Sequence, residues 1–349
     1  KNSIQKQVSL CYKKHSMSKK NSNVLNKESR LNEIYRSFKK NIKVLKKDPG
    51  VIAVSGGPDS LALAALSKKY SKENSNKFYY LLVDHGIRKN SSKEALAVKK
   101  FLEKRKISLI VKKNKKKITK NIHSNAREIR YEIIKNFCLQ KKVKYILTAH
   151  HSDDQIETFL IRLSRGSGVQ GLSSMRKVTK LNKKVKLIRP TLDLSKKNLL
   201  YVTKEFFGKF FVDPSNRNNK FLRTKIRKLA KSFEKSGIPQ KQILKSIQNL
   251  KLSSETLNKY SNNIFKKNTK IRKNKIIVDY KNLFQESPEI QLKILTRIIK
   301  KCSNSYYPPR SKKVFNLIDR ISKNKDKRLT LGGCVIKINK NYAEIAKEA

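Results

Sequence analysis

The chain has 349 residues, enough for two domains of ordinary size, and 37% of them are hydrophobic, so a sizeable core can form. It carries 85 Lys and Arg residues against 25 Asp and Glu, a formal net charge of +60. This imbalance favours a nucleic acid as partner, because each cation that meets a phosphate releases a condensed counterion. The alternative is a compositional bias that only keeps the chain in solution. No run of about 18 apolar residues is present, so we expect no membrane-spanning helix.

Four cysteines are scattered along the chain, at Cys11, Cys138, Cys302 and Cys334. None forms a C-x-x-C pair, so the sequence does not indicate a zinc ribbon or an iron–sulfur site. Their scatter is typical of a reducing compartment, and we expect a cytoplasmic protein.

Residues 1–28 are rich in Lys, Ser and Asn and show no hydrophobic period. We expect a flexible basic arm here. A targeting segment is the alternative, although no amphipathic Arg-rich pattern supports it.

Strand and helix patterns then alternate over residues 29–236, which we expect to form one catalytic domain. Short apolar runs of the kind that become buried parallel strands occur at 51–54, 78–83, 107–111, 145–148 and 185–188. Helical patterns lie at 31–45, from 61 onwards, and at 91–105, 121–140 and 153–163. This rhythm predicts a doubly wound parallel α/β sheet of the Rossmann-like kind, in which ligands bind at the carboxyl ends of the strands.

The pattern changes at about residue 237. Helical segments dominate at 240–265, 288–301 and 310–323, and two short apolar stretches follow at 328–331 and 335–338 with Gly332-Gly333 between them. We expect residues 237–349 to form a smaller, mainly helical C-terminal domain that ends in a hairpin.

The first apolar run leads into a loop with the features of a phosphate site. Two glycines allow a sharp turn that brings backbone N–H groups close to an anion, and proline suits the first turn of the following helix. The helix N-terminus adds partial positive charge, and the serines can donate hydrogen bonds to phosphate. An aspartate beside bare phosphates needs a cation, so we expect it to hold Mg²⁺; the alternative is an ordinary turn with an Asp cap. The loop consists of Ser55, Gly56, Gly57, Pro58, Asp59 and Ser60.

This S-G-G-x-D-S string resembles the signature of the PP-loop ATP pyrophosphatases and lacks the lysine of a Walker A loop. The resemblance implies that ATP is split between its α- and β-phosphates, so that a carbonyl-type oxygen is adenylated and diphosphate leaves.

A second block, residues 148–158, places three acids within five residues: Asp153, Asp154 and Glu157. Helical spacing lets Glu157 share a face with either aspartate, and like charges this close need a cation such as Mg²⁺ or an ammonium group. Two alternatives remain: acids that complement a helix dipole, or a Zn²⁺ site that includes His150 and His151.

The string T-A-H-H-x-D-D-Q-x-E-T resembles a block of the tRNA(Ile)-lysidine synthetase family. Further blocks resemble that family in the same order, so that the likeness spans roughly residues 50 to 228, with a weaker match at 331–334. They contain Asp84 and His85, implied near the adenine; Arg127 and Arg130 on a helix; Arg165, Gly166 and Gly168 in a loop; Arg189-Pro190; residues 213–216; and Arg223 and Arg227 on a later helix. Thr224 departs from the Asn that is usual in the family, which puts one hydrogen bond in doubt.

The resemblance implies that tRNA(Ile) with a CAU anticodon, L-lysine and ATP yield lysidine at the wobble cytidine, AMP and diphosphate. ATP and Mg²⁺ would be the cofactors, the C-terminal domain would contribute tRNA contacts, and a homodimer is compatible with the relatives. On this hypothesis Asp153, Asp154 and Glu157 bind lysine or Mg²⁺, and one of them accepts the proton of the amine. The arginines 127, 130, 223 and 227 would hold tRNA phosphates or transition-state charge, or else form surface ion pairs. Residues 112–117, mostly lysine, fit a diffuse steering patch.

Three rival readings remain open from the sequence. A tRNA thiolase of the same superfamily needs paired or cluster-bound cysteines, which are absent. An amide-forming synthetase that acts on a small molecule leaves the charge of +60 without a role. A non-catalytic RNA-binding protein would not need the intact loop and acids.

Overall fold

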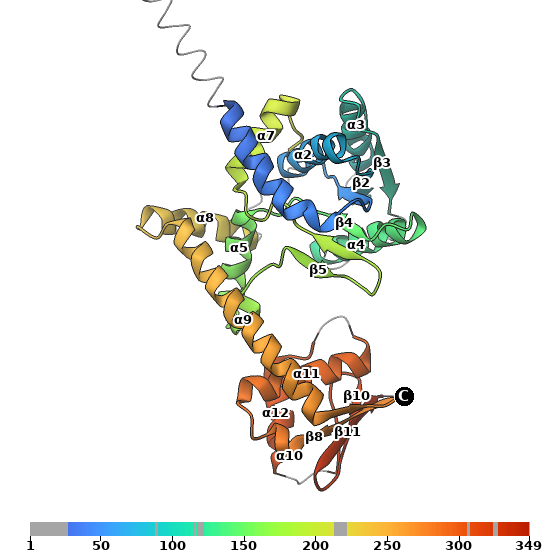
Figure 1. Ribbon diagram of the computed structural model, residues 1–349, viewed down its shortest axis with the longest axis vertical. Coiled ribbons are helices and arrows are strands. Elements are labelled where there is room, and N and C mark those ends of the chain that lie inside the picture. Colours follow the sequence, from blue (N-terminus) through green and yellow to red (C-terminus); the bar gives the residue numbers. More distant parts are fainter. Residues whose placement is uncertain are drawn as a thin grey trace, which may run out of the picture. The chain divides into compact units, whose positions relative to one another are not determined.

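The computed structural model describes residues 27–87, 90–114, 116, 122–212, 222–305, 308–323 and 327–348. The chain divides into two compact units, residues 1–247 and 248–349, and the boundary falls inside the long helix α9 (Gln240–Asn268) (Figure 1). No helix within the described ranges combines the length and the apolar character needed to cross a membrane. The expected N-terminal arm lies outside the described residues except for its last two.

The first unit contains a six-stranded sheet in the order β3-β2-β1-β4-β6-β5. Five strands run parallel and only the edge strand β5 is antiparallel, which confirms the expected doubly wound α/β fold. The sequence did not reveal β5, because it has three residues and two of them are exposed. The strands are β1 (Gly50–Ala53), β2 (Phe78–Asp84), β3 (Leu109–Lys113), β4 (Tyr145–Leu147), β5 (Val178–Lys180) and β6 (Lys186–Ile188).

Both faces of the sheet are covered, which explains why the central strands are apolar throughout. On β1, Ile52 joins one core with the helix over residues 27–42, α2 (Pro58–Asn74), α3 (Ser91–Glu103) and α7 (Lys196–Phe207). The adjacent Val51 points to the other face and packs with α4 (Ile122–Gln140). Because successive strand residues point to opposite faces, a strand buried on both faces needs apolar residues at every position.

A third, smaller core holds the helices that follow β4. Ile156 and Leu160 of α5 (Ser152–Leu163) pack with Ile226 of α8 (Leu222–Lys235) and with the start of α9. Two short elements, the turn η1 (Lys43–Leu45) and α6 (Val169–Leu172), complete this unit. The α5–α8 contact brings the acids of one helix next to the arginines of the other.

The second unit combines helices with a five-stranded antiparallel sheet in the order β7-β8-β11-β10-β9. The expected hairpin is confirmed as the pair β9 (Arg328–Thr330) and β10 (Cys334–Ile338). The sequence did not predict β7 (Thr269–Ile271), β8 (Lys275–Asp279) or β11 (Tyr342–Lys347), which have three, five and six residues. The sheet packs with α10 (Tyr280–Leu283), α11 (Pro288–Ser303) and α12 (Ser311–Ser322) in one core.

The loop between β1 and α2 depends on one glycine in the left-handed region. Gly56 has φ +83°, and a Cβ there would lie 2.6 Å from Cγ2 of Val98 on α3. Gly57 has φ −71° and precedes Pro58 at the first position of α2, and a Cβ on Gly57 would meet nothing closer than 3.7 Å. Ser60 closes the loop, because its Oγ accepts from the backbone N–H of Ser55 and donates to the carbonyl of Gly57.

We therefore expect Gly56→Ala to destabilise the protein by about 3 kcal/mol, from left-handed strain and the clash with Val98 together. Gly57→Ala is the matched control and should stay within about 1 kcal/mol of the wild type. Urea unfolding of the two variants measures the difference. Equal stability of both would contradict the loop geometry.

Candidate active site

The loops that follow β1 and β4 meet at the carboxyl edge of the sheet. These two strands are neighbours in the sheet although they are not consecutive in the chain, and open α/β sheets bind ligands in the crevice at such a point. Asp59 follows β1, His151 follows β4, and their side chains are 3.7 Å apart. The structure thus brings together two motifs that lie 92 positions apart in the sequence (151 − 59).

Three carboxylates surround the buried His151. Its Nε2 lies 3.7 Å from Oδ2 of Asp59 and 3.5 Å from Oδ2 of Asp154, and its Nδ1 lies 3.6 Å from Oδ2 of Asp153. Burial alone would lower the pKa of His151, but hydrogen bonds to Asp153 and Asp59 and the charge of Asp154 outweigh it and raise the pKa to about 10. An imidazolium therefore balances part of the repulsion among the acids.

Helix ends hold these acids in place. The backbone N–H of His151 donates to Asp154 at the start of α5, and the backbone N–H of Lys196 at the start of α7 donates to Asp153. Nδ1 of His151 also lies 3.4 Å from the backbone nitrogen of Asp154, where a neutral ring would accept a cap bond. The surrounding negative charge favours the protonated ring, so we assign Nδ1 as a donor toward Asp153. Burial opposes ionisation of Asp153, but the His151 and Lys196 bonds hold its pKa at about 2.

The carboxylate of Asp59 has one oxygen that can still bind a ligand. Its Oδ1 is buried and has no hydrogen-bond partner among the described residues. A lone buried carboxylate oxygen beside a phosphate loop fits a hard cation, because Mg²⁺ in nucleotide sites is held by one or two carboxylates and by phosphate oxygens. In the described part of the chain, no group of three or more His, Cys, Asp and Glu residues is arranged so that it could hold a metal ion by itself.

The carboxylate of Glu157 has different interaction partners from those of the aspartates. It is 4% exposed, and its carboxylate pairs with two arginines of α8: Oε2 lies 3.2 Å from Nε of Arg223, and Oε1 accepts from Nε of Arg227. Burial lowers the pKa of Arg227, but the hydrogen bond to Glu157 outweighs it and raises that pKa. The sequence grouped Glu157 with Asp153 and Asp154, whereas the structure gives it partners 66 and 70 positions away (223 − 157 and 227 − 157).

Positive charge gathers around His150. Burial and the nearby Arg189, Arg127, Arg223 and Arg130 hold the pKa of His150 well below its ordinary value, so this ring is neutral. Its Nδ1 lies 2.8 Å from the hydroxyl of Thr148.

Tyr131 on α4 contributes to the same cluster. The guanidinium groups of Arg127 and Arg130 lie 5.2 and 5.7 Å from the centre of its ring, and its buried hydroxyl has no partner among the described residues. Such a group can bind an anion or a polar ligand atom. The sequence reading assigned no role to Tyr131 or Arg189, although both stand in the blocks that resemble the family.

Asp84 is the last residue of β2 and His85 follows it, and the two side chains differ in the atoms they leave available to a ligand. The carboxylate of Asp84 accepts from Ser92 at 2.6 Å and from the backbone N–H of Gly86 at 3.0 Å, so its two oxygens are engaged by its own loop. His85 has a buried Nδ1 without a partner in the described part of the chain, and burial and Arg130 lower its pKa. His85 is thus the better candidate for a contact with a nucleotide.

No described contact joins the loop of Arg165, Gly166 and Gly168 to the residues above. Arg165 is exposed, Gly166 has φ +64°, and Gly168 precedes α6. Arg162 donates to the carbonyls of Gly171 and Ser174 and so ties the loop back to α5. Two parts of the matching blocks, Arg88 and residues 213–216, lie outside the described residues.

Comparison with known proteins agrees with this geometry. Residues 26–232 match the profile of the PP-loop domain family. The chain is 34% identical to the tRNA(Ile)-lysidine synthase of Wolbachia pipientis wMel, over 82% of this chain and 67% of that protein. It is 31% identical to the tRNA(Ile)-lysidine synthase of Orientia tsutsugamushi (strain Boryong), over 90% of this chain and 72% of that protein.

Among solved structures, the U34-tRNA thiolase NcsA from Methanococcus maripaludis with its 4Fe-4S cluster is similar, with a TM-score of 0.55. The match covers 64% of this chain and 80% of that one at 24% identity, which shows the shared fold alone. The profile match takes in more than half of the chain, and the relatives align with most of it. The protein therefore belongs to the tRNA(Ile)-lysidine synthase family of PP-loop proteins.

Proposed function

We propose that this chain joins L-lysine to C2 of the wobble cytidine of tRNA(Ile) with a CAU anticodon, through an adenylated cytidine, and releases AMP and diphosphate. The observation that carries the proposal is the meeting of the phosphate loop and the acid block at one edge of the sheet, where Oδ1 of Asp59 has no hydrogen-bond partner among the described residues. The family membership supports the same reaction. A net charge of +60 suits a tRNA substrate.

In the first step the loop of residues 55–60 binds the phosphates of ATP. Backbone N–H groups, the N-terminus of α2 and the serine hydroxyls provide donors for the charge that develops on the leaving diphosphate. Mg²⁺, held through Asp59, would supply Lewis-acid stabilisation of that charge. The neutral His85 lies at the end of β2, where it can contact the base of the nucleotide.

In the second step the lysine amine must lose a proton before it attacks C2. Asp153 is a poor proton acceptor, because a carboxyl group with a pKa of about 2 holds a proton weakly. This leaves Asp154 and Glu157 as acceptors, and Glu157 stands where Arg223 and Arg227 could also bind the carboxylate of an amino acid. The arginines around His150 suit the phosphates of tRNA and the bound AMP.

The thiolase alternative finds little support in the cysteines. Cys138 lies on the buried face of α4, where burial raises the pKa of its thiol to about 12. Cys302 and Cys334 belong to the core of the second unit, and Cys11 lies outside the described residues. A buried, protonated thiol is unsuited to sulfur transfer or to cluster ligation.

Asp59→Asn should fold normally and lower the rate of tRNA adenylation by about 10²–10³, because a neutral amide cannot hold the cation at the phosphates. The rate of diphosphate release with tRNA present measures this step. Asp48→Asn removes a carboxylate from an exposed pair with Lys144 and is the matched control. Wild-type turnover in Asp59→Asn would refute the role of the loop.

Glu157→Gln should raise the lysine concentration for half-maximal lysidine formation at least about tenfold, while adenylation falls less. The loss of its charge from between two part-exposed arginines should also cost about 1–2 kcal/mol of stability. Single-turnover assays with and without lysine separate the two steps, and Glu33→Gln on an exposed helix position is the control. An equal loss in both steps would remove Glu157 from the lysine pocket.

Incorporation of labelled L-lysine into tRNA(Ile) with a CAU anticodon, beside the same tRNA with U at the wobble position, tests the function directly. Label that enters only the C-containing tRNA, and only with ATP, would establish it. ATP consumption without label would point to another RNA modification.

A further inference from the structure

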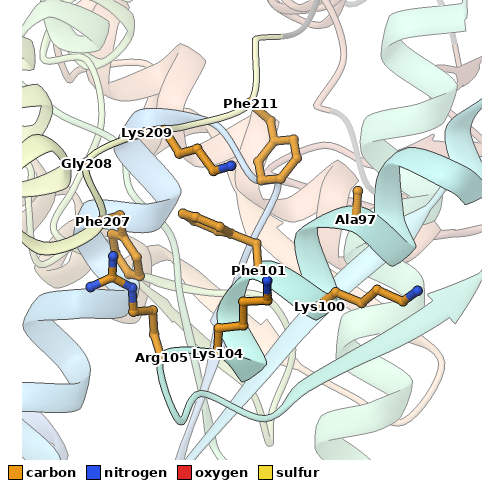
Figure 2. A pocket seen from close by; sticks show the side chains of 9 residues that line it. All are labelled: Ala97, Lys100, Phe101, Lys104, Arg105, Phe207, Gly208, Lys209 and Phe211. Carbon is orange, nitrogen blue, oxygen red and sulfur yellow. The ribbon is translucent and has the colours of Figure 1, made fainter.

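Two neighbouring cavities lie on one side of the first unit, between α2, α3 and α7. The larger measures about 550 Å³ and is formed by α3 and residues 207–211, and the smaller measures about 320 Å³ and is formed by α2, α7 and the turn after α3. They share Arg105 and Phe207 in their walls. Figure 2 shows the larger cavity. Neither has a role in the reaction described above.

Cations without acids line both cavities. The larger is lined by Lys100, Lys104, Arg105 and Lys209, the smaller by Lys68, Lys69, Lys72 and again Arg105, and no described lining residue is acidic. Lys100, Lys104 and Lys209 are exposed, and no ion pair with another described residue holds them. Uncompensated charge of this density attracts a polyanion.

Aromatic rings form the floor between these cations (Figure 2). The half-buried ring of Phe101 lies 5.7 Å from Phe207 and 5.5 Å from Phe211 between centroids, and the ammonium of Lys209 is 5.7 Å from the Phe101 ring. Phe206 adds a further ring that is 39% exposed. Rings interleaved with free cations are the pattern that binds single-stranded RNA, in which bases stack on the rings while cations contact the backbone.

The same elements also contact the phosphate loop. The backbone N–H of Phe211 donates to the carbonyl of Gly56 at 3.0 Å, and Val98 of α3 packs against Gly56. Phe211, which lines the larger cavity, is therefore in direct contact with the loop proposed to bind ATP.

We propose that this surface, named the α3–α7 patch and made of Lys100, Phe101, Lys104 and Lys209, binds an unpaired stretch of the substrate RNA beside the cytidine that reacts. The inference rests on the proposed function for the identity of the RNA. Two joined cavities with seven distinct cations exceed the needs of a single nucleotide, and the absence of acids disfavours a basic or neutral peptide. The patch would position the tRNA and take no part in the chemistry.

The test compares two triple variants that each remove three positive charges. Lys100→Gln, Lys104→Gln and Lys209→Gln alter the patch, whereas Lys180→Gln, Lys183→Gln and Lys184→Gln alter exposed lysines of the β5–β6 hairpin and serve as the control. Binding of unmodified tRNA(Ile) transcript to the full chain is measured over a range of salt concentrations without ATP. The patch variant should raise the Kd at least about tenfold and lower the slope of log K against log salt by about 2, as expected for lost phosphate contacts.

The control variant should keep the wild-type Kd and slope. Equal effects of the two variants, or none in either, would overturn the proposal, because binding would then be diffuse. A greater loss of ATP affinity than of RNA affinity would also overturn it and make the cavity a nucleotide site.

A second variant, Phe101→Leu, keeps the floor apolar but removes a stacking surface. We expect weaker tRNA binding by about fivefold or more with an unchanged salt slope. Unchanged binding with native circular dichroism would refute the stacking role. Lysine incorporation by the wild type is measured in a separate assay. If RNA bound at the patch but no lysidine formed, the proposed function would be wrong and the proposed RNA-binding role of the patch would still hold.

Discussion

The site depends on one electrostatic constraint: three aspartates must stay close together in a partly buried crevice. His151 satisfies it, because its ring lies within 3.7 Å of Asp59, Asp153 and Asp154 and carries a proton at neutral pH. These contacts link the loop after β1, the start of α5 and, through Asp153, the start of α7. The contacts of one histidine therefore hold three separate segments of the site together.

Two adjacent histidines show how sharply the environment changes across this crevice. His151 faces carboxylates and has a raised pKa, whereas His150 faces four arginines and has a strongly lowered pKa. A negative and a positive region thus lie side by side at the end of β4. The first suits a metal ion and an amine, the second suits phosphates, and the proposed reaction needs both. Glu157 joins them, because it belongs to the acid block but pairs with the arginines of α8.

The charge of +60 has more than one use in this structure. The arginines near His150 range from the buried Arg189 to the exposed Arg127 and Arg223, and a guanidinium can hold an anion in a defined geometry. The lysines of the α3–α7 patch are exposed and surround aromatic rings. In the proposed complex the arginines would contact the part of the RNA that reacts. The lysines and phenylalanine of the patch would instead position a flexible single strand beside it.

Local sequence patterns were sufficient to predict the class of fold and to propose where the chemistry takes place. The short apolar runs and the S-G-G-P-D-S loop are local signals, because strand period, turn geometry and helix start are set by neighbouring residues. The same holds for the expected strands of the parallel sheet, all of which are present. The sequence did not predict edge strands such as β5 and β7, because three-residue strands with exposed side chains show almost no alternation of apolar and polar residues.

The pairing of oppositely charged side chains is set by the packing of elements that lie far apart in the sequence. Asp59 and His151 come from different strands, and Glu157 finds Arg227 across 70 positions because Ile156 and Ile226 pack in one small core. The sequence spacing placed Glu157 with its neighbours Asp153 and Asp154, a reasonable inference within one helix. A helix presents several faces, however, and the helix that packs on each face determines the partner. For the same reason the α3–α7 patch, drawn from the end of α3 and the segment after α7, has no signature in the sequence.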